Sequence, residues 1–300
     1  MIPLFDLHCD TLEEMYLGNY PIDSSPLHIS LDKCKNFSPY IQVMAIWSDS
    51  RLTPKEAYLR YKCCVNYAKD QGITFVKDRF IVNSDKTFIL AVEDGRIVEN
   101  DLTRLTEFKD DGVKIITPFW KDTNQLGGAW NTNIGLSDLG IDFIKKCFEL
   151  SIIPDVSHAS VESTKEIIRL AMDYNKTIIA SHSNSYTVCS HHRNLRDDDF
   201  VSIVKFEGLV GISLANEHLQ SDKRSNIRSI LSHVYHYLTL GGINTICLGC
   251  DFDGVSTLPL EIDNVSDLAK LHSEIKYNFG NEAADKIFFK NALEFFKRNY

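Results

Sequence analysis

Short apolar segments rich in β-branched residues recur along the chain and alternate with segments of helical periodicity. Eight apolar segments predict strands, at residues 4–10, 40–47, 87–93, 112–120, 152–158, 177–183, 208–215 and 245–251. Helices are predicted at residues 54–69, 101–109, 137–150, 160–174, 197–205 and 226–240, with two more near residues 265–277 and 282–298. Strands that are apolar on both faces and alternate with helices indicate a parallel sheet covered by helices.

Eight strand and helix units within 300 residues favour an α/β fold that closes into a (β/α)8 barrel. The alternative is an open doubly wound sheet, but the sequence lacks the G-x-G-x-x-G turn that accompanies nucleotide-binding sheets of that kind. No linker, low-complexity tract or sequence repeat marks a domain boundary. Residues 1–300 are therefore expected to form one catalytic barrel domain with C-terminal helices.

Most of the predicted strands end in a side chain that can bind a metal ion or transfer a proton. These side chains are His8, Asp10, Glu93, His158, His182 and Asp251. All strands of a parallel barrel open at one face, so residues far apart in the sequence converge there. Residues two apart in a strand point to the same side, so we expect His8 and Asp10 to face the barrel mouth together while Cys9 turns away.

Three histidines and three carboxylates at one barrel mouth carry a high desolvation cost unless a cation compensates them. Nitrogen and oxygen ligands without a cysteine-rich cluster suit Zn²⁺, and a carboxylate such as Glu93 can bridge two ions. We therefore predict a paired-metal hydrolytic centre. Taken alone, each of these residues also fits an ordinary hydrogen-bonded structural role.

The segment "HHRNLRDDD", residues 191–199, follows the sixth predicted strand and is expected to form a loop at the same face. Arg193 is a candidate for binding a substrate carboxylate, because a guanidinium group binds a carboxylate through two parallel hydrogen bonds. An ion pair with Asp197 or Asp198 explains the same residue equally well from the sequence alone.

The composition of the chain excludes some classes of binding partner. The formal net charge of −9 argues against binding to nucleic acid or to an anionic membrane surface, since both need clustered Lys and Arg. The sequence contains neither a signal peptide nor an apolar span of about 18 residues, so a cytoplasmic enzyme is expected. The eight cysteines are scattered and predict reduced structural thiols, while Cys9 and Cys250, which flank candidate site residues, are also candidates for a reactive or ligating thiolate.

Six motifs occur in an order that resembles one known family. They are "DLHCDTL" (6–12), "AVEDG" (91–95), "GLSDLGIDFIKKCFELSIIPDVSHAS" (135–160), "ASHSN" (180–184), "HHRNLRDDD" (191–199) and "LGCDFDGV" (248–255). Together they are similar to the renal, or membrane, dipeptidase family of zinc peptidases, family M19, which in turn resembles the amidohydrolase barrels. The similarity extends over nearly the whole chain.

The resemblance implies a metallodipeptidase that hydrolyses free dipeptides, L-Xaa-D-Xaa pairs included, through a metal-activated water. It implies two zinc ions per chain. His8 and Asp10 would bind the first ion and His158 and His182 the second, with Glu93 bridging both. Family members are homodimers, and the same assembly is expected here.

The resemblance also implies roles for residues that bind no metal. Arg193 would hold the C-terminal carboxylate of the dipeptide, and Asp251 would be the catalytic proton-transfer group, with Asp253 in a supporting position. In "GVKIITPFWKDTNQLGG", residues 112–128, Trp120 stands where animal members carry a histidine thought to stabilise the oxyanion. Trp120 is therefore predicted to contact substrate, as an N–H donor or as a wall of the pocket.

Two other functions fit parts of the same pattern. A related binuclear amidohydrolase acting on an N-acyl amino acid or a lactam would use the same ligands and differ in the loops around Trp120 and Arg193. A non-catalytic metal-binding protein would be expected to lack at least one ligand or Asp251, and none is missing.

Overall fold

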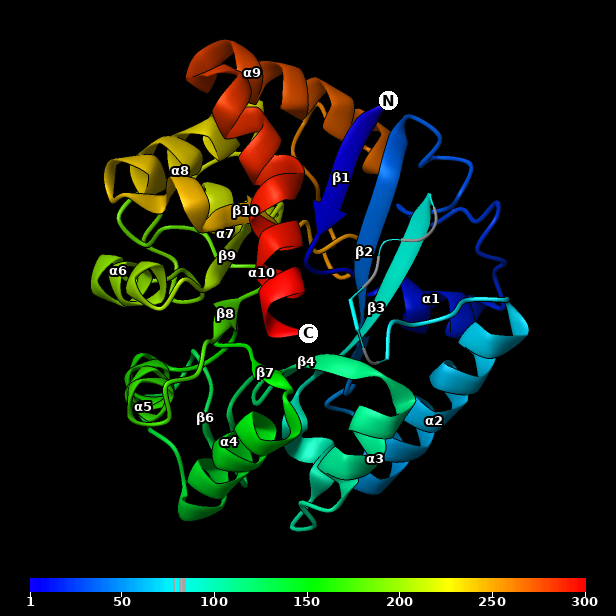
Figure 1. Cartoon of the computed structure of the whole chain (residues 1–300), viewed down its shortest axis with the longest axis vertical. Helices are drawn as coiled ribbons and strands as arrows, with labels where there is room; N and C mark the ends of the chain where they lie inside the picture. The colour runs from blue at the N-terminus through cyan, green and yellow to red at the C-terminus, as the bar shows by residue number, and fades with distance from the viewer. Residues whose placement is uncertain (78, 81, 83–84) are drawn as a thin grey trace.

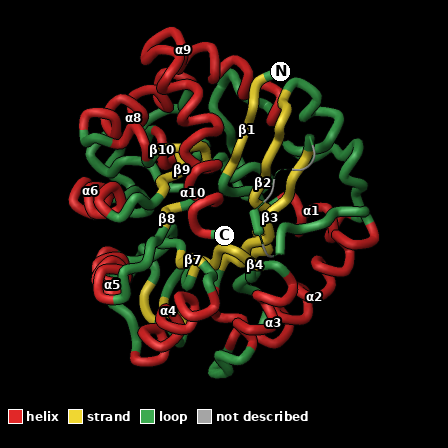
Figure 2. The backbone as a smooth tube through the Cα atoms, in the orientation of Figure 1, coloured by secondary structure: helices red, strands yellow, loops and turns green. Residues whose placement is uncertain are grey.

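Eight parallel strands form a ring that helices surround (Figures 1 and 2). The computed structural model describes residues 1–77, 79–80, 82 and 85–300. The strands are β1 (Ile2–Asp6), β2 (Phe37–Trp47), β3 (Lys86–Glu93), β4 (Val113–Thr117), β7 (Ile153–Pro154), β8 (Ile179–Ala180), β9 (Leu209–Ile212) and β10 (Ile246–Leu248). Their order is β7-β4-β3-β2-β1-β10-β9-β8, and a parallel bridge between Asp155 and Ile179 joins the two ends. The predicted (β/α)8 barrel is confirmed.

The helices lie around this ring, apart from α10, which covers one of its ends. They are α1 (Thr11–Gly18), α2 (Pro54–Asp70), α3 (Arg104–Asp111), α4 (Asp138–Leu150), α5 (Val161–Asp173), α6 (Asp197–Lys205), α7 (Asn216–Leu219), α8 (Ile227–Thr239), α9 (Leu268–Asp285) and α10 (Asn291–Asn299). A two-stranded hairpin, β5 (Thr123–Asn124) with β6 (Gly127–Gly128), follows β4. All predicted helices are present, whereas α1 and α7 were missed because they are too short to show helical periodicity. No helix in the described part of the chain is long and apolar enough to cross a membrane.

Local sequence explains where several helices begin and end. Thr53 and Glu56 form a reciprocal capping box at the start of α2, and Asn226 accepts a hydrogen bond from the backbone N–H of Ser229 at the start of α8. Gly280 has a φ of 89° and interrupts α9, because this left-handed conformation suits glycine. The interruption separates the two segments predicted at residues 265–277 and 282–298.

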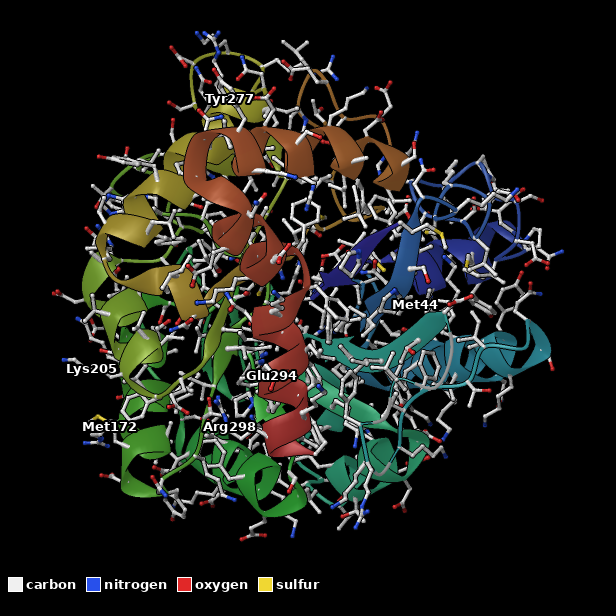
Figure 3. The ribbon with its side chains drawn as sticks, turned by 45° about the horizontal axis from the view of Figure 1, so that its top comes forward. Met44, Met172, Lys205, Tyr277, Glu294 and Arg298 are labelled. Carbon is white, nitrogen blue, oxygen red and sulfur yellow. The ribbon has the colours of Figure 1, made fainter. Side chains whose placement is uncertain are left out.

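Apolar side chains fill the inside of the barrel. They include Phe5, Leu7, Ile41, Val43, Ala45, Ile89, Ala91, Ile115, Ile153, Ile179, Leu209 and Cys247. Helix α10, red in Figure 1, crosses the centre of the ring, and its Phe296 ring lies 5.0 Å from that of Phe5. Figure 3 shows Arg298 on the same helix, where its guanidinium is 2.9 Å from the carboxylate of Glu207. Because α10 closes the end where the strands begin, the open mouth lies where they end.

Several strands stop earlier than predicted. His8, His158, His182 and Asp251 lie two to four residues beyond the ends of their strands. Residues 8–10 lie beyond β1, so the predicted extent of this strand is wrong: Asp10 is the residue before α1, and Cys9 forms an isolated bridge with Phe252. His8 and Asp10 nevertheless face the same cluster, with Nε2 and Oδ2 3.5 Å apart, while Cys9 is buried in the core. The chain leaves the sheet here because the carboxyl ends of barrel strands diverge into loops, where side chains replace ladder hydrogen bonds.

Candidate metal centre and active site

The five residues predicted to bind metal lie together at the barrel mouth. His8 and Asp10 follow β1, Glu93 is the last residue of β3, His158 follows β7 and His182 follows β8. All five side chains are at least mostly buried, with Glu93 only 3% exposed. Barrel closure brings them together from four separate strands.

Glu93 lies between His8 on one side and His158 with His182 on the other. Its Oε2 is 3.4 Å from Nε2 of His8, whereas its Oε1 is 2.7 Å from Nε2 of His158 and 3.6 Å from Nε2 of His182. The Nε2 atoms of His158 and His182 are 3.0 Å apart. One carboxylate therefore presents a separate oxygen to each side of the cluster, which is the arrangement a bridging ligand requires.

Asp10 and Asp251 complete the side that contains His8. Nε2 of His8 is 3.5 Å from Asp10 Oδ2 and 3.8 Å from Asp251 Oδ1. Among the described residues, ligand atoms of His8, Asp10 and Asp251 lie within 4.8 Å of one another, and so do those of His8, Glu93 and His182. Nε2 of His8 and Oδ1 of Asp10 find no hydrogen-bond partner in the described chain. Buried polar atoms without partners, in a set of nitrogen and oxygen donors, fit a metal centre.

The side chains of this cluster shift one another's pKa values strongly and in opposite directions. Burial raises the pKa of Glu93, but the charges of His158 and His8 outweigh it and leave that pKa well below its usual range. Burial lowers the pKa of His8, but the charge of Glu93 raises it well above its usual value. Burial raises the pKa of Asp251 well above its usual range, and Asp10 and Glu93 add to the rise. Such mutual dependence is relieved when a divalent cation replaces the shared protons.

Hydrogen bonds behind the histidines orient their rings. Nδ1 of His182 is 2.7 Å from Oγ of Ser181, which is itself hydrogen-bonded to the buried carboxylate of Asp155. Nδ1 of His158 is 2.8 Å from the backbone carbonyl oxygen of Trp120. Partners at Nδ1 leave Nε2 of both rings facing Glu93, a support that metal-binding histidines usually have.

Asp155 and Ser181 support the two histidines but were not predicted as site residues from the sequence. Asp155 accepts hydrogen bonds from the backbone N–H groups of Ser157 and Ser181, at 2.9 Å each, and so connects the segments after β7 and β8. The available signal was the small polar residues that precede the two histidines in "DVSH" and "ASHS". Their hydrogen bonds place His158 and His182 side by side.

A cavity of about 460 Å³ opens above the cluster and is lined by Asp10, Glu93, His158 and Asp251 together with residues of the surrounding loops. Arg193 lines it as well. Its side chain is 6% exposed, and within the described residues its Nη2 has no hydrogen-bond partner. Burial lowers the pKa of Arg193 to about 10, which reflects the cost of holding this charge away from water.

The structure does not form the ion pair considered as an alternative for Arg193. Asp197 instead contacts His236, whose Nε2 is 2.9 Å from Asp197 Oδ1. Among the described residues Arg193 has no salt bridge to Asp197 or Asp198, because its side chain turns into the barrel mouth rather than toward α6. It is a buried cation that faces the cavity.

Aromatic rings form one wall of the same cavity. Trp120 lines it, and its ring centroid lies 4.8 Å from that of Trp47 and 6.3 Å from that of His158. Trp47, the last residue of β2, was missed because an aromatic residue at a strand end is usually part of the core. Trp47 pairs in register with Glu93, so the two indoles lie beside this carboxylate.

Asp253 and the two cysteines near the cluster occupy supporting positions. The carboxylate of Asp253 accepts hydrogen bonds of 2.6 Å from the hydroxyl of Thr11 and from the backbone N–H of His28. Cys9 and Cys250 are fully buried, and burial raises the pKa of each thiol well above its usual value. These thiols are inert packing groups at neutral pH.

Comparison with known proteins places this arrangement in a family. The family model described as membrane dipeptidase (peptidase family M19) matches residues 1–299. An uncharacterized protein in the pqqA 5′ region of Klebsiella pneumoniae is 31% identical over 206 residues, which cover 64% of this chain and 74% of that protein.

Solved structures share the fold at low sequence identity. Dipeptidase AC, a metallopeptidase of family M19, has a TM-score of 0.91 at 22% identity, covering 100% of this chain and 99% of that one. A metallopeptidase from Rhodobacter sphaeroides, liganded with a phosphinate mimic of the dipeptide L-Ala-D-Ala, has a TM-score of 0.90 at 21% identity with the same coverage. The probable dipeptidase PvdM from Pseudomonas aeruginosa has a TM-score of 0.84 at 16% identity, covering 99% of this chain and 95% of that one. The chain belongs to the membrane dipeptidase family, peptidase family M19, and is a metallopeptidase that hydrolyses dipeptides.

Proposed function

We propose that this enzyme uses two zinc ions to hydrolyse free dipeptides and accepts a D residue at the C-terminal position. The proposal rests mainly on one observation. Glu93 presents its two oxygens to separate histidine groups in the same cavity that contains the buried cation Arg193. The phosphinate mimic of L-Ala-D-Ala in the structure from Rhodobacter sphaeroides supports the inclusion of L,D pairs.

The residues fit a binuclear centre by donor type and position. His8 and Asp10 would hold one ion, His158 and His182 the other, and Glu93 both. When bound, such ions lower the pKa of a water molecule and polarise the scissile carbonyl group. Hydrogen bonds donated by Nδ1 of His182 to the Ser181 hydroxyl and by Nδ1 of His158 to the Trp120 carbonyl would hold the two histidines in the required ring orientation.

The chain's other residues would position the substrate and move the proton. Arg193 would bind the C-terminal carboxylate through charge-assisted hydrogen bonds, which replaces the partner its Nη2 lacks in the described chain. Asp251 would take a proton from the attacking water and give it to the leaving amine nitrogen. Trp120 and Trp47 would exclude bulk water from the reacting atoms.

The test is hydrolysis of a defined panel by zinc-loaded protein. We expect release of free amino acids from L-Xaa-L-Xaa and L-Xaa-D-Xaa dipeptides, and kcat/KM about 10²-fold lower for the matching C-terminal amides because they lack the charge that Arg193 binds. A chelator should abolish activity and lower the melting temperature, and added zinc should restore both. Equal rates on acids and amides would remove the role of Arg193, and a zinc-loaded protein without dipeptidase activity would contradict the proposal.

We also propose a homodimer, as the family resemblance implies. Light scattering of the purified protein would decide this point, since a monomer mass of 34.2 kDa predicts about twice that value for the dimer.

A further inference from the structure

The first turn of α1 places two acidic side chains in the wall of the cavity. Glu13 and Glu14 both line it, three and four residues after Asp10. Neither residue belongs to the metal cluster. Their position beside that cluster raises the question of what part of a substrate they meet.

Glu13 is a buried acid with an unused oxygen. Its side chain is only 3% exposed, and its Oε1 is 3.2 Å from Nη1 of Arg60. Its Oε2 has no hydrogen-bond partner anywhere in the described chain. Arg60 is also shared, because Nη1 lies 3.6 Å from Asp49 Oδ2. A buried acceptor without a partner costs free energy that a ligand donor would recover.

Glu14 adds a second carboxyl group to the same wall. It is half-buried, and no salt bridge to it is formed by the residues that the structure describes. Glu13 shares Arg60 with Asp49, which also binds the exposed Arg51. Burial raises the pKa of Glu13 to about 8 and raises that of Glu14 above its usual value, so a cation placed beside the two acids would be stabilised by them.

The opposite end of the cavity is where Arg193 lies. The charge of Arg193 acts on His158 and His182, the histidines on the Oε1 side of Glu93. Lys121, which is exposed, lines the cavity next to Trp120 on that same side, and Glu217 also lies near Arg193. Asp10, from which α1 continues, lies on the Oε2 side with His8. Arg193 and the two acids of α1 thus line the same cavity next to different members of the cluster, so a substrate held by Arg193 can extend toward Glu13 and Glu14.

We propose that Glu13 and Glu14 select dipeptides whose N-terminal residue has a cationic side chain, such as lysine, ornithine or arginine. This inference rests on the proposed function, because Arg193 must hold the C-terminal carboxylate for the N-terminal residue to extend toward α1. The ammonium or guanidinium group then contacts the carboxylate of the half-buried Glu14 and approaches the buried carboxyl group of Glu13 behind it. Both acids act as specificity residues and take no part in bond cleavage.

The experiment compares L-Lys-L-Ala with L-norleucyl-L-Ala, which has an uncharged side chain of nearly the same length. For the native enzyme we expect kcat/KM about tenfold higher for the lysine dipeptide, as a partly desolvated ion pair provides. Glu14→Gln should reduce this ratio to about twofold, chiefly by lowering kcat/KM for L-Lys-L-Ala. Glu217→Gln, a change in the same cavity near Arg193, is the matched control and should keep the full ratio.

Other results would overturn the inference. If Glu14→Gln lowered kcat/KM equally for both dipeptides, the acid would bind the α-ammonium group that both share. If the native enzyme hydrolysed both at the same rate, the acidic wall would select nothing, while the dipeptidase function would stand. If neither dipeptide were hydrolysed by zinc-loaded protein, the proposed function and this inference would both fail. Glu13→Gln provides a second variant, with its folding checked by thermal melting, and should also lower the ratio.

Discussion

Asp251 has a backbone conformation that is uncommon for residues other than glycine. Its φ is 62°, in the left-handed region where aspartate and asparagine are tolerated better than most side chains. Its N–H donates to the carbonyl of His8 at 3.1 Å, and its carbonyl accepts from the N–H of Gly254 at 3.2 Å. His158, with a φ of 70°, is similarly constrained. Strained residues of this kind persist where surrounding hydrogen bonds hold a functional side chain in place.

The role of Asp251 can be tested by a single substitution. Asp251→Asn keeps the shape but cannot transfer a proton, so kcat should fall by about 10² to 10⁴ while the bound metal stays at two ions per chain. Activity assays with metal analysis measure both quantities. Asp253→Asn, in the neighbouring position that binds Thr11 and His28, should keep most of the activity. Loss of metal from Asp251→Asn would show that this carboxylate is a ligand instead.

At the scale of elements, glycines allow the strands and loops around the cluster to approach one another closely. A Cβ added at Gly249, just after β10, would overlap the backbone carbonyl oxygen of Ser181, the residue before His182. A Cβ added at Gly254 would instead overlap the carboxylate oxygens of Asp10 and Asp251. The first contact is with backbone, which cannot move without displacing β8, whereas the second is with the ends of side chains.

Alanine substitutions at these two glycines should affect stability and activity in opposite ways. Gly249→Ala should lower the melting temperature by several degrees, because an overpacked core costs about 1 to 3 kcal/mol. Gly254→Ala should leave the melting temperature nearly unchanged but lower kcat/KM at least tenfold, since Asp10 and Asp251 must rotate away. Thermal melting and dipeptide hydrolysis of both variants provide the comparison. Similar effects of the two variants on stability would contradict this distinction.

At the scale of the whole molecule, buried hydrogen bonds connect the outer helices to the loops of the site. His233 of α8 is fully buried, and its Nδ1 accepts a 3.0 Å hydrogen bond from the N–H of Ser185, three residues after His182. Its Nε2 is 3.2 Å from the carbonyl oxygen of Leu219 in α7. Burial lowers the pKa of His233 from 6.5 to about 4, so it is neutral in the folded state near pH 7.

Stability should therefore fall in mild acid. Between pH 6.5 and pH 4 the unfolded chain binds a proton at His233 that the folded protein excludes, so the contribution is present above pH 6.5 and is lost as the pH falls. Between pH 7 and pH 5 it amounts to about 2 kcal/mol of unfolding free energy. Denaturant unfolding at pH 7 and pH 5 measures this loss of unfolding free energy. The loss should be smaller for His233→Gln than for the native protein, although the variant is less stable at pH 7. An equal loss in both proteins would contradict the assignment.

The alternation of apolar and polar positions along the sequence was enough to predict many features of the fold and the site. It predicted eight strands, the helices long enough to show periodicity, and the polar side chains His8, Asp10, Glu93, His158 and His182 at or just beyond strand ends. These features are local, because burial selects apolar residues with the period of each element. A barrel then requires the strand ends to meet, whatever their distances along the chain.

Tertiary structure alone decided what those side chains face. Only barrel closure set which oxygen of Glu93 faces His8 and which faces His158, and only the direction of one loop left Arg193 in the cavity rather than paired with Asp197. The same holds for Asp155 behind His182 and for Glu13 at the far wall. Distances between residues remote in sequence depend on how helices and loops pack around the barrel. The hydrophobic pattern cannot predict that packing, because it reports only which positions of each element are buried.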